Sequence, residues 1–304
     1  MNQATKNVLK KINKYITYKR HNKPPTGLII KDGEIIIKTY KENNLIIKDI
    51  KINDEYINQL VQLVCFHSGE NFDESNPIIK TNIPHTLHRF TAIHKLITGD
   101  KLHSIVLRIQ SDILKLSLSL FTQDETIISK IKNAIKKGSN ILVSGGTGSG
   151  KTTLLNSMIE LFPNQRIVTI ENSLEIKIPT NITSSQQLVL TSNKKVNVTY
   201  SDLINVSMRL DPERIIIGEI DIENTSTYLR MLNTGHKGVY TTIHGSNAFN
   251  AMLAIESNLK IGGNTTPQNE LFDYIGKNID YILQINHFKI EEFKTIEEIR
   301  EEKK

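Results

Sequence analysis

The second half of the chain alternates short apolar runs with segments whose apolar residues recur at helical spacing. The apolar runs predict strands at 140–144, 166–171, 214–218, 238–243 and 280–285. The periodic segments predict helices at 151–161, 200–209, 223–233, 246–259 and 267–277. Such alternation is typical of a mostly parallel sheet covered by helices, so the pattern predicts an α/β domain.

A further helix precedes these strands. Residues Thr122–Glu125 have the capping-box pattern S/T-x-x-E, and apolar residues at helical spacing continue up to Gly138. We place a domain boundary just before this helix, which gives an N-terminal domain of residues 1–120 and a C-terminal domain of residues 121–304. The densely charged residues from Glu291 onward predict a solvated helix or a frayed tail.

The first third of the chain has a different pattern, in which strand-like runs surround one helix. Two runs, Leu28–Lys31 and Glu34–Tyr40, are joined at Asp32-Gly33, a strong hairpin signal. Further runs predict strands at 45–52, 86–93 and 103–109. Asn53 or Asp54 can cap a helix that ends before Gly69 and has one apolar face, formed by Ile57, Leu60, Val61, Val64 and Cys65. The pattern of residues 1–120 predicts a small α+β domain with Cys65 in its core.

Residues 5–20 can form a basic amphipathic helix, with an apolar face of Val8, Ile12, Tyr15 and Ile16. Every charged residue before Asp32 is Lys or Arg. One interpretation is contact with an anionic membrane surface. The other is a helix packed on its own domain, with its basic face in water. The apolar face is narrow and lacks Trp and Phe, which favours the packed helix.

Composition narrows the classes of function. The 304 residues, 38% hydrophobic and 23% charged, are typical of a globular protein of two domains. A net charge of +6 permits an anionic partner without requiring one. The single cysteine excludes an internal disulfide and a multi-cysteine zinc site. The histidines at 85, 88 and 94 have no acidic residue among them, which argues against a metal site.

The sequence also bears on location. No apolar run approaches the ~18–20 residues of a membrane span. The basic N-terminal segment is not followed by the apolar core of a secretory signal. We therefore expect a cytoplasmic protein.

The candidate chemistry begins with Gly-Gly-Thr-Gly-Ser-Gly-Lys-Thr-Thr at 145–153. It contains G-x-x-x-x-G-K-[ST] between a strand and a helix, the context that a P-loop requires. Backbone N–H groups of such a loop surround phosphate oxygens at the positive end of the helix. Lys151 is expected to reach the β- and γ-phosphates of ATP, and the Thr152 hydroxyl to hold Mg²⁺. The residues expected to bind the nucleotide are Gly145, Gly146, Thr147, Gly148, Ser149, Gly150, Lys151, Thr152 and Thr153.

Three polar residues follow apolar strands and are predicted to share one sheet edge, because ligands bind at the carboxyl ends of parallel strands. Glu219 can act as a general base on water; the alternative is an acid that favours the start of the next helix. Glu171 can order a Mg²⁺-bound water. His244 follows Thr-Thr-Ile and would face the phosphates; the alternative is an ordinary hydrogen-bonding histidine.

Together these segments resemble the type II/type IV secretion ATPases, which are hexameric RecA-like traffic ATPases. Four boxes carry the resemblance, at 145–153, 166–172, 214–219 and 233–244. The short N-terminal domain and the absence of zinc-binding cysteines resemble the type IV secretion and conjugation branch. The resemblance implies a RecA-like C-terminal domain, ATP hydrolysis, a homohexamer at the cytoplasmic face of the inner membrane, and secretion-channel components as partners.

The resemblance also implies that arginines complete the nucleotide site. Arg89 and Arg108 resemble arginines that the N-terminal domain supplies to the phosphates, and Arg209 matches a family arginine. Three positions depart from the family pattern, in which Asp and two Arg are usual: Asn172, Asp211 and Asp221. The lost arginines put in doubt how charge on the γ-phosphate is stabilised.

Three alternatives remain open. The same boxes serve pilus-assembly and retraction motors. A non-catalytic, nucleotide-gated adaptor would explain the lost arginines. A nucleic-acid translocase would use the basic charge, but that charge is concentrated near the N-terminus without interleaved aromatic residues, which argues against direct nucleic acid binding.

Overall fold

The protein is described by a computed structural model. It describes residues 3–19, 25–39, 44–49, 52–84, 86, 88–109, 117–190 and 197–302. The described residues divide into two compact units, the first ending at Ile109 and the second beginning at Ser117, with Asn197 grouped with the first. The predicted boundary near residue 120 stays a prediction.

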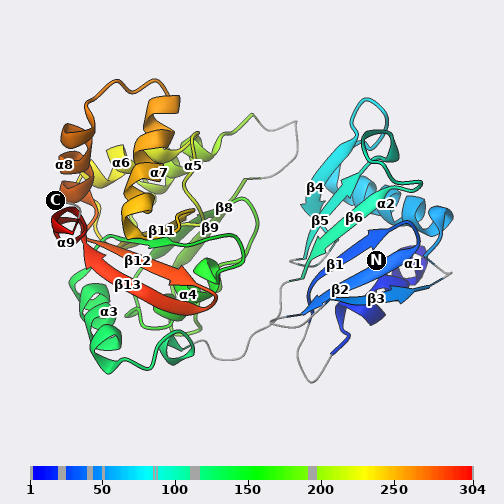
Figure 1. Cartoon of the computed structure of the whole chain (residues 1–304), viewed down its shortest axis with the longest axis horizontal. Helices are drawn as coiled ribbons and strands as arrows, with labels where there is room; N and C mark the ends of the chain where they lie inside the picture. Colours follow the sequence, from blue (N-terminus) through cyan, green and yellow to red (C-terminus); the bar gives the residue numbers. More distant parts are fainter. Residues whose placement is uncertain are drawn as a thin grey trace. The chain divides into compact units, whose positions relative to one another are not determined.

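Unit 1 is an antiparallel sheet with two α-helices (Figure 1). Its helices are α1 (Gln3–Ile16), α2 (Asp54–Ser68) and the short η1 (Lys95–Ile97). Its strands are β1 (Pro25–Lys31), β2 (Glu34–Thr39), β3 (Leu45–Lys48), β4 (Ile78–Asn82), β5 (Arg89–Ile93) and β6 (Ser104–Arg108). The strand order is β3-β2-β1-β6-β5-β4. Apolar residues of both α-helices and of one sheet face form a single core, so the other face of the sheet is turned away from the helices.

The local signals read from the sequence of unit 1 are confirmed. Asp32 and Gly33 have positive φ angles of 47° and 80°, as a two-residue hairpin turn requires. Asn53 caps α2 by accepting the N–H of Tyr56, and Gly69 ends the helix in the left-handed conformation. Cys65 is buried, and burial raises the pKa of its thiol to about 11. Strand β4 was not predicted from the sequence.

Helix α1 packs on its own unit through its apolar face. Leu9, Ile12 and Ile16 are buried in the core shared with α2 and the sheet. The Tyr56 hydroxyl donates to the carbonyl of Val8 at 2.9 Å, and Lys14 pairs with Asp49 at 2.7 Å. This packing supports the second interpretation of the basic helix.

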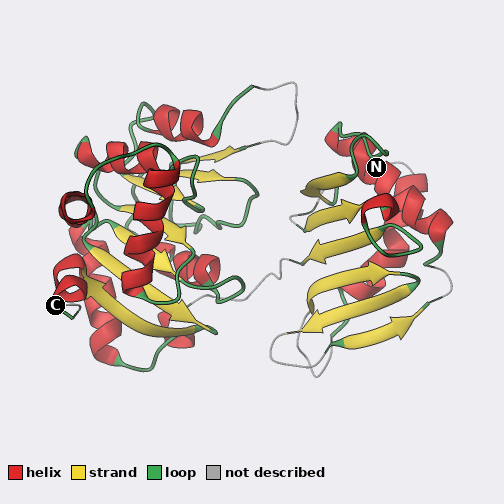
Figure 2. Ribbon diagram, turned by 45° about the horizontal axis from the view of Figure 1, so that its top comes forward, coloured by secondary structure: helices red, strands yellow, loops and turns green. Residues whose placement is uncertain are grey.

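Unit 2 alternates strands and helices (Figure 2). Its strands are β7 (Ile141–Ser144), β8 (Ile167–Glu171), β9 (Ser185–Val189), β10 (Arg214–Ile217), β11 (Val239–Ile243), β12 (Tyr281–Asn286) and β13 (Lys289–Thr295). Its helices are η2 (Leu118–Leu120), α3 (Glu125–Lys137), α4 (Lys151–Ile159), α5 (Tyr200–Ser207), α6 (Thr225–Asn233), α7 (Ala248–Ile261), α8 (Gln268–Asn278) and α9 (Ile296–Glu301).

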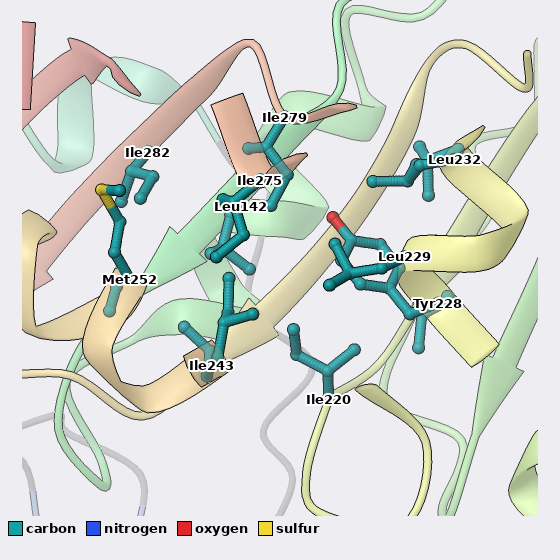
Figure 3. Close-up of a cluster of buried hydrophobic side chains, with 14 of the residues drawn as sticks. Leu142, Ile220, Tyr228, Leu229, Leu232, Ile243, Met252, Ile275, Ile279 and Ile282 are labelled. Atoms are coloured by element: carbon teal, nitrogen blue, oxygen red, sulfur yellow. The ribbon is translucent and has the colours of Figure 1, made fainter. Parts of the chain in front are cut away.

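The sheet of unit 2 has the order β13-β12-β7-β11-β10-β8-β9, and all its pairings are parallel except that of β13 with β12. One face packs against α5 to α9, where Met252, Ile275 and Tyr228 join a large apolar cluster (Figure 3). The other face packs against α3 and α4. The predicted α/β architecture, with a smaller N-terminal α+β domain, is confirmed.

The prediction for the C-terminal residues was wrong for strand β13 and for the burial of its apolar residues, and correct in placing a helix near residue 296. From Lys289 the chain forms strand β13 and then helix α9, where the sequence indicated a solvated helix or a frayed tail. Every third residue is apolar and buried: Ile290, Phe293, Ile296 and Ile299. The many charges between these residues lie at the surface and conceal the apolar repeat.

Two smaller differences concern the start and the edge of unit 2. Asp124, not Thr122, caps α3, because its side chain accepts the N–H groups of Thr126 and Ile127. Strand β9 was not predicted, because its first residues are exposed and polar.

Within the described residues, every helix is too short or too polar to span a membrane.

Candidate functional site

The carboxyl ends of neighbouring parallel strands bring the predicted site residues to one edge of unit 2. The loop 145–150 follows β7, His244 follows β11, and Glu219 follows β10 after one glycine. Glu171 is the last residue of β8. Because β7, β11, β10 and β8 are adjacent in that order, these groups lie side by side, as the sequence predicted.

The loop 145–150 exposes its central residues and leaves the start of the following helix without a side-chain cap. The N–H groups of Gly145 and Ser149 donate to the carbonyls of Ile243 and Gly146. Gly146, Thr147 and Gly148 are exposed, whereas Ser149 is buried. Gly150 precedes α4 with a φ of 102°, and no side chain caps the start of this helix. A Cβ atom at Gly145 would lie 2.5 Å from the Ser149 Oγ and from the Ile285 carbonyl oxygen, so the loop requires glycine there. The loop therefore presents an uncapped helix N-terminus, which suits an anion.

The Lys151 ammonium lies inside this loop. Its Nζ donates to the carbonyls of Gly145 at 2.8 Å and Gly146 at 3.1 Å, and it lies 3.3 Å from His244 Nδ1. The side chain is therefore held within reach of any phosphate seated in the loop. Thr152 is half-buried in the first turn of α4, next to Lys151.

His244 joins Lys151 to Glu219. Its Nε2 lies 2.8 Å from Glu219 Oε1. Because a lysine ammonium can only donate, the His244 Nδ1 that faces it accepts, and the proton of the neutral ring then lies on Nε2, directed at the Glu219 carboxylate. The three residues form a polar chain, Lys151–His244–Glu219, across three strand ends. Both His244 and Glu219 remain about half exposed, at 53% and 45% of their side chains, so water can reach them.

Backbone contacts from the adjacent strands fix the position of Glu219. The Thr242 hydroxyl donates to the Gly218 carbonyl at 2.7 Å, and the Ile220 N–H donates to the Thr242 carbonyl at 2.9 Å. The Asn224 side chain donates to the Glu219 carbonyl at 3.3 Å. These contacts hold the backbone on both sides of Glu219 in place.

Glu171 occupies a different environment from Glu219. It is 2% exposed, and its Oε1 accepts the N–H groups of Glu175 at 2.7 Å and Ile176 at 2.8 Å. This carboxylate therefore holds the loop after β8. The role predicted for Glu171, ordering a Mg²⁺-bound water, stays a prediction.

The three arginines divide into two groups. Arg89 on β5 and Arg108 on β6 are directly opposite each other, on the sheet face turned away from the helices of unit 1. Arg209 is exposed just after α5, in the loop that leads to the amino end of β10. The structure therefore places Arg209 at the opposite edge of its own sheet from the loop 145–150, not beside it.

The three positions that depart from the family pattern have different surroundings. Asp211 has a φ of 52°, a conformation that Asp adopts more readily than most residues. Asp221 is exposed, and its Oδ1 accepts the N–H of Glu223 at 2.9 Å. Asn172 is also exposed, directly after β8.

His94 and His103 of unit 1 make hydrogen-bond and ring contacts within their own unit. His94 Nδ1 accepts the N–H of Leu96 at 3.3 Å, and its ring lies 4.4 Å from that of His103. His85 lies outside the described residues. In the described ranges, no group of three or more His, Cys, Asp or Glu side chains is arranged to hold a metal ion.

Sequence reasoning missed two residues next to the site. Gln284 on β12 is buried, and its side-chain amide donates to the Gly245 carbonyl at 3.2 Å, beside His244. Phe288 donates its N–H to the Ser149 carbonyl at 2.8 Å. A glutamine inside the apolar run 281–285 was a signal for the first, whereas nothing in the sequence indicated the second.

The parallel sheet, the glycine loop with its lysine, and the acid on a neighbouring strand end define a P-loop nucleotide-binding protein. A family model described as "Type II/IV secretion system protein" matches residues 89–263. The conjugal transfer protein TrbB of Rhizobium radiobacter is 30% identical over 252 residues, which are 74% of this chain and 75% of TrbB. The chain therefore belongs to the type II/IV secretion system protein family, close to its conjugation and type IV secretion ATPases.

Other relatives agree. The type IV secretion system protein VirB11 of Bartonella quintana is 32% identical over 174 residues, which are 55% of this chain and 48% of VirB11. The ATPase DotB of Legionella pneumophila has a TM-score of 0.61 at 22% identity, over 92% of this chain and 74% of that chain. The pilus retraction motor PilT has a TM-score of 0.63 at 18% identity, over 86% and 74%. The two structures show a shared fold.

Proposed function

We propose that this protein hydrolyses ATP with Mg²⁺ and that the hydrolysis cycle powers a type IV secretion or conjugation apparatus. The observation that carries the proposal is the Lys151–His244–Glu219 chain at the mouth of the P-loop. It links a cation that can bind phosphate to a water-accessible carboxylate through the His244 ring. Membership of the family that includes TrbB supports the cellular role.

Each residue of the site has a distinct role in this mechanism. Lys151 exchanges its contacts with the loop carbonyls for phosphate oxygens and neutralises their charge. The Thr152 hydroxyl holds Mg²⁺, which adds positive charge at the phosphates. Glu219 orients or activates the attacking water. When Lys151 exchanges its contacts, His244 transmits this movement to Glu219, because the imidazole ring contacts both side chains.

Arg89 and Arg108 supply further positive charge to the phosphates in a homohexameric ring. Like charges directly opposite on neighbouring strands repel each other, so an anionic ligand bound at this pair would reduce the repulsion. At the position of Asp221, where family members usually have arginine, this chain offers an acid. Arginines from unit 1 would replace the missing charge.

We further propose that the ring works at the cytoplasmic face of the inner membrane, on components of the secretion channel. Lys10 of α1 is exposed on the side opposite the buried face of this helix and can add weak attraction to anionic lipid. Liposome flotation at low and high salt tests this contact. Flotation that does not weaken with salt would contradict it.

The test of the enzymatic proposal is phosphate release by the full chain with Mg²⁺ or with EDTA, over a range of protein concentrations. We expect Mg²⁺-dependent turnover whose specific activity rises as subunits associate. Arg89→Ala and Arg108→Ala should each lower turnover, by up to the ~10³-fold or more that an arginine at a γ-phosphate can contribute. Lys80→Ala is the matched control, an exposed cation on the same sheet face.

A second candidate function is a non-catalytic, nucleotide-gated adaptor, favoured by the acid at Asp221. This candidate predicts ATP binding without turnover at any protein concentration. A pilus-assembly or retraction motor would use the same chemistry, so hydrolysis does not separate it from a secretion ATPase. Its test is whether deleting the gene abolishes conjugation or pilus movement.

A further inference from the structure

The hairpin of β12 and β13 is drawn in orange-red to red in Figure 1. Its turn contacts the P-loop, because the Phe288 N–H donates to the Ser149 carbonyl. The turn residues His287 and Phe288 have φ angles of 46° and 59°. Turns of this type favour Asn and Gly, because those residues tolerate a positive φ. A phenylalanine in this conformation is strained, and strain of this kind persists where surrounding contacts maintain it.

Those contacts connect Phe288 to the end of the P-loop. Its N–H donates to the Ser149 carbonyl at 2.8 Å. A Cβ atom at Gly150 would lie 2.9 Å from the Phe288 ring, so the ring lies directly against this glycine. Ser149 and Gly150 immediately precede Lys151, so the contact acts where the loop turns into helix α4.

The same hairpin touches the site at two other points. The Ile285 carbonyl lies against Gly145, at the beginning of the P-loop. The Gln284 amide donates to the Gly245 carbonyl at 3.2 Å, next to His244. Ile285 and Phe288 thus contact the two ends of the P-loop, and Gln284 contacts the loop that carries His244.

Phe288 also contacts the segment by which the chain enters unit 2. Its ring stacks on that of Phe121, with centroids 6.2 Å apart and planes at 13°. The next residue but one, Ile290, donates its N–H to the Phe121 carbonyl at 3.0 Å. The tip of the hairpin therefore lies between the P-loop and the entry segment at Phe121.

We propose that Phe288 is a positioning residue that holds the P-loop in its nucleotide-binding shape and couples nucleotide binding to the entry segment at Phe121. This inference rests on the proposed function only so far as the P-loop binds nucleotide. The alternative is an ordinary hairpin turn. Under that alternative, Phe288→Gly relieves backbone strain and leaves nucleotide affinity unchanged.

The direct test is the Kd of fluorescent ADP for the full chain and for Phe288→Gly. The substitution removes the ring but keeps the N–H, and it gives the P-loop freedom to leave its bound shape. We expect the Kd to rise about tenfold, and the KM for ATP to rise with a smaller change in kcat. An unchanged Kd in a folded Phe288→Gly protein would overturn the proposal.

Two matched variants separate strain from positioning. His287→Gly relieves the same kind of strain in the same turn but keeps the Phe288 ring, so its Kd should equal that of wild type. Phe288→Tyr keeps an aromatic ring at this position, so its Kd for ADP should stay close to that of wild type. If His287→Gly weakens binding as much as Phe288→Gly, turn strain is the cause and the proposal is wrong.

A measurement on the wild-type protein does not depend on any variant folding. Hydrogen exchange of the segments 286–290 and 118–122 is compared with and without ADP. We expect ADP to slow exchange in both segments; protection confined to the P-loop would overturn the coupling. A wild-type chain that binds ADP but does not hydrolyse ATP would defeat the proposed ATPase activity and not this inference, because neither readout needs turnover.

Discussion

The two edges of the sheet in unit 2 use polar residues in opposite ways. At the carboxyl edge, His244 and Glu219 are half exposed and form a chain with Lys151. At the amino edge, Arg214 is 3% exposed, and its guanidinium donates to the Gln165 side chain at 2.7 Å and to the Ile135 carbonyl at 2.9 Å. His244 and Glu219 at the carboxyl edge stay open to water, whereas Arg214 at the amino edge satisfies buried hydrogen bonds.

Asn140 extends the contrast at the amino edge. Its N–H donates to Asp280 at 2.7 Å, its side-chain amide donates to the Asn278 carbonyl at 2.9 Å, and its side-chain oxygen accepts the Val239 N–H at 3.0 Å. This residue ties the starts of three strands together. The comparison teaches that polar residues at strand ends indicate a site only where they remain accessible and adjacent to one another.

The largest expected effect is that of Lys151→Ala on nucleotide binding. Loss of the cation leaves phosphate charge unneutralised, so we expect ADP affinity to fall by about 100-fold or more, the equivalent of about 2.7 kcal/mol. The free energy of unfolding without nucleotide should fall less than the free energy of ADP binding, because Lys151 contacts the Gly145 and Gly146 carbonyls and His244 in loops at the sheet edge. Isothermal titration and urea denaturation measure the two quantities.

The control for that experiment is Lys137→Ala, an exposed lysine at the end of α3. This variant should change neither the ADP affinity nor the free energy of unfolding. An equal loss of binding in both variants would mean that general positive charge, and not the P-loop contact, binds the nucleotide.

The next effect is that of Arg214→Met on stability. The substitution removes a buried guanidinium and leaves the Ile135 carbonyl and the Gln165 side chain without their donor, which costs about 1–3 kcal/mol of unfolding free energy. Nucleotide affinity should stay at the wild-type value. The distinction between the edges would fail if this variant bound ADP as weakly as Lys151→Ala.

The smallest effect concerns His103 in unit 1, a buried polar group like those of the amino edge. Burial lowers the pKa of His103 in the folded protein, and its Nδ1 accepts the Lys95 N–H at 3.1 Å. Below the ordinary pKa of about 6.5 the unfolded chain binds a proton more readily, so stability should fall as pH decreases through this range. The melting temperature of the full chain, scanned from pH 8 to pH 5, measures the change.

The matched variants for this scan are His103→Gln and His67→Gln. The first should reduce the loss of stability at low pH, and the second, at an exposed position on α2, should retain it. Identical pH profiles for wild type and His103→Gln would show that other groups cause the dependence.

The carboxyl edge could be predicted from the sequence because its signals are local. The P-loop motif, the strand before Glu219 and the strand before His244 are each contained in a few residues, and parallel topology then brings them together. The Lys151–His244 contact could not be predicted, because it depends on the rotamers of two side chains that are distant in sequence, one in helix α4 and one directly after β11.

The contacts between the β12–β13 turn and the P-loop could not be predicted for a different reason. Phe288 contacts Gly150 and Phe121, which are distant in sequence, and its turn lacks the usual Asn and Gly. The burial of Phe293 and Ile296 was concealed because charged residues separate them from each other and from the next apolar positions. Long-range packing and a charged surface thus account for the main errors.

The most direct test of the account is ATP turnover and ATP affinity measured on the same preparation of Glu219→Gln. The account predicts that kcat falls about 10²–10⁴-fold, because the water loses its oriented base. It also predicts that ATP affinity stays close to the wild-type value, because Lys151 and the P-loop are intact. Wild-type turnover by Glu219→Gln would contradict the claim that the Lys151–His244–Glu219 chain is the hydrolytic site.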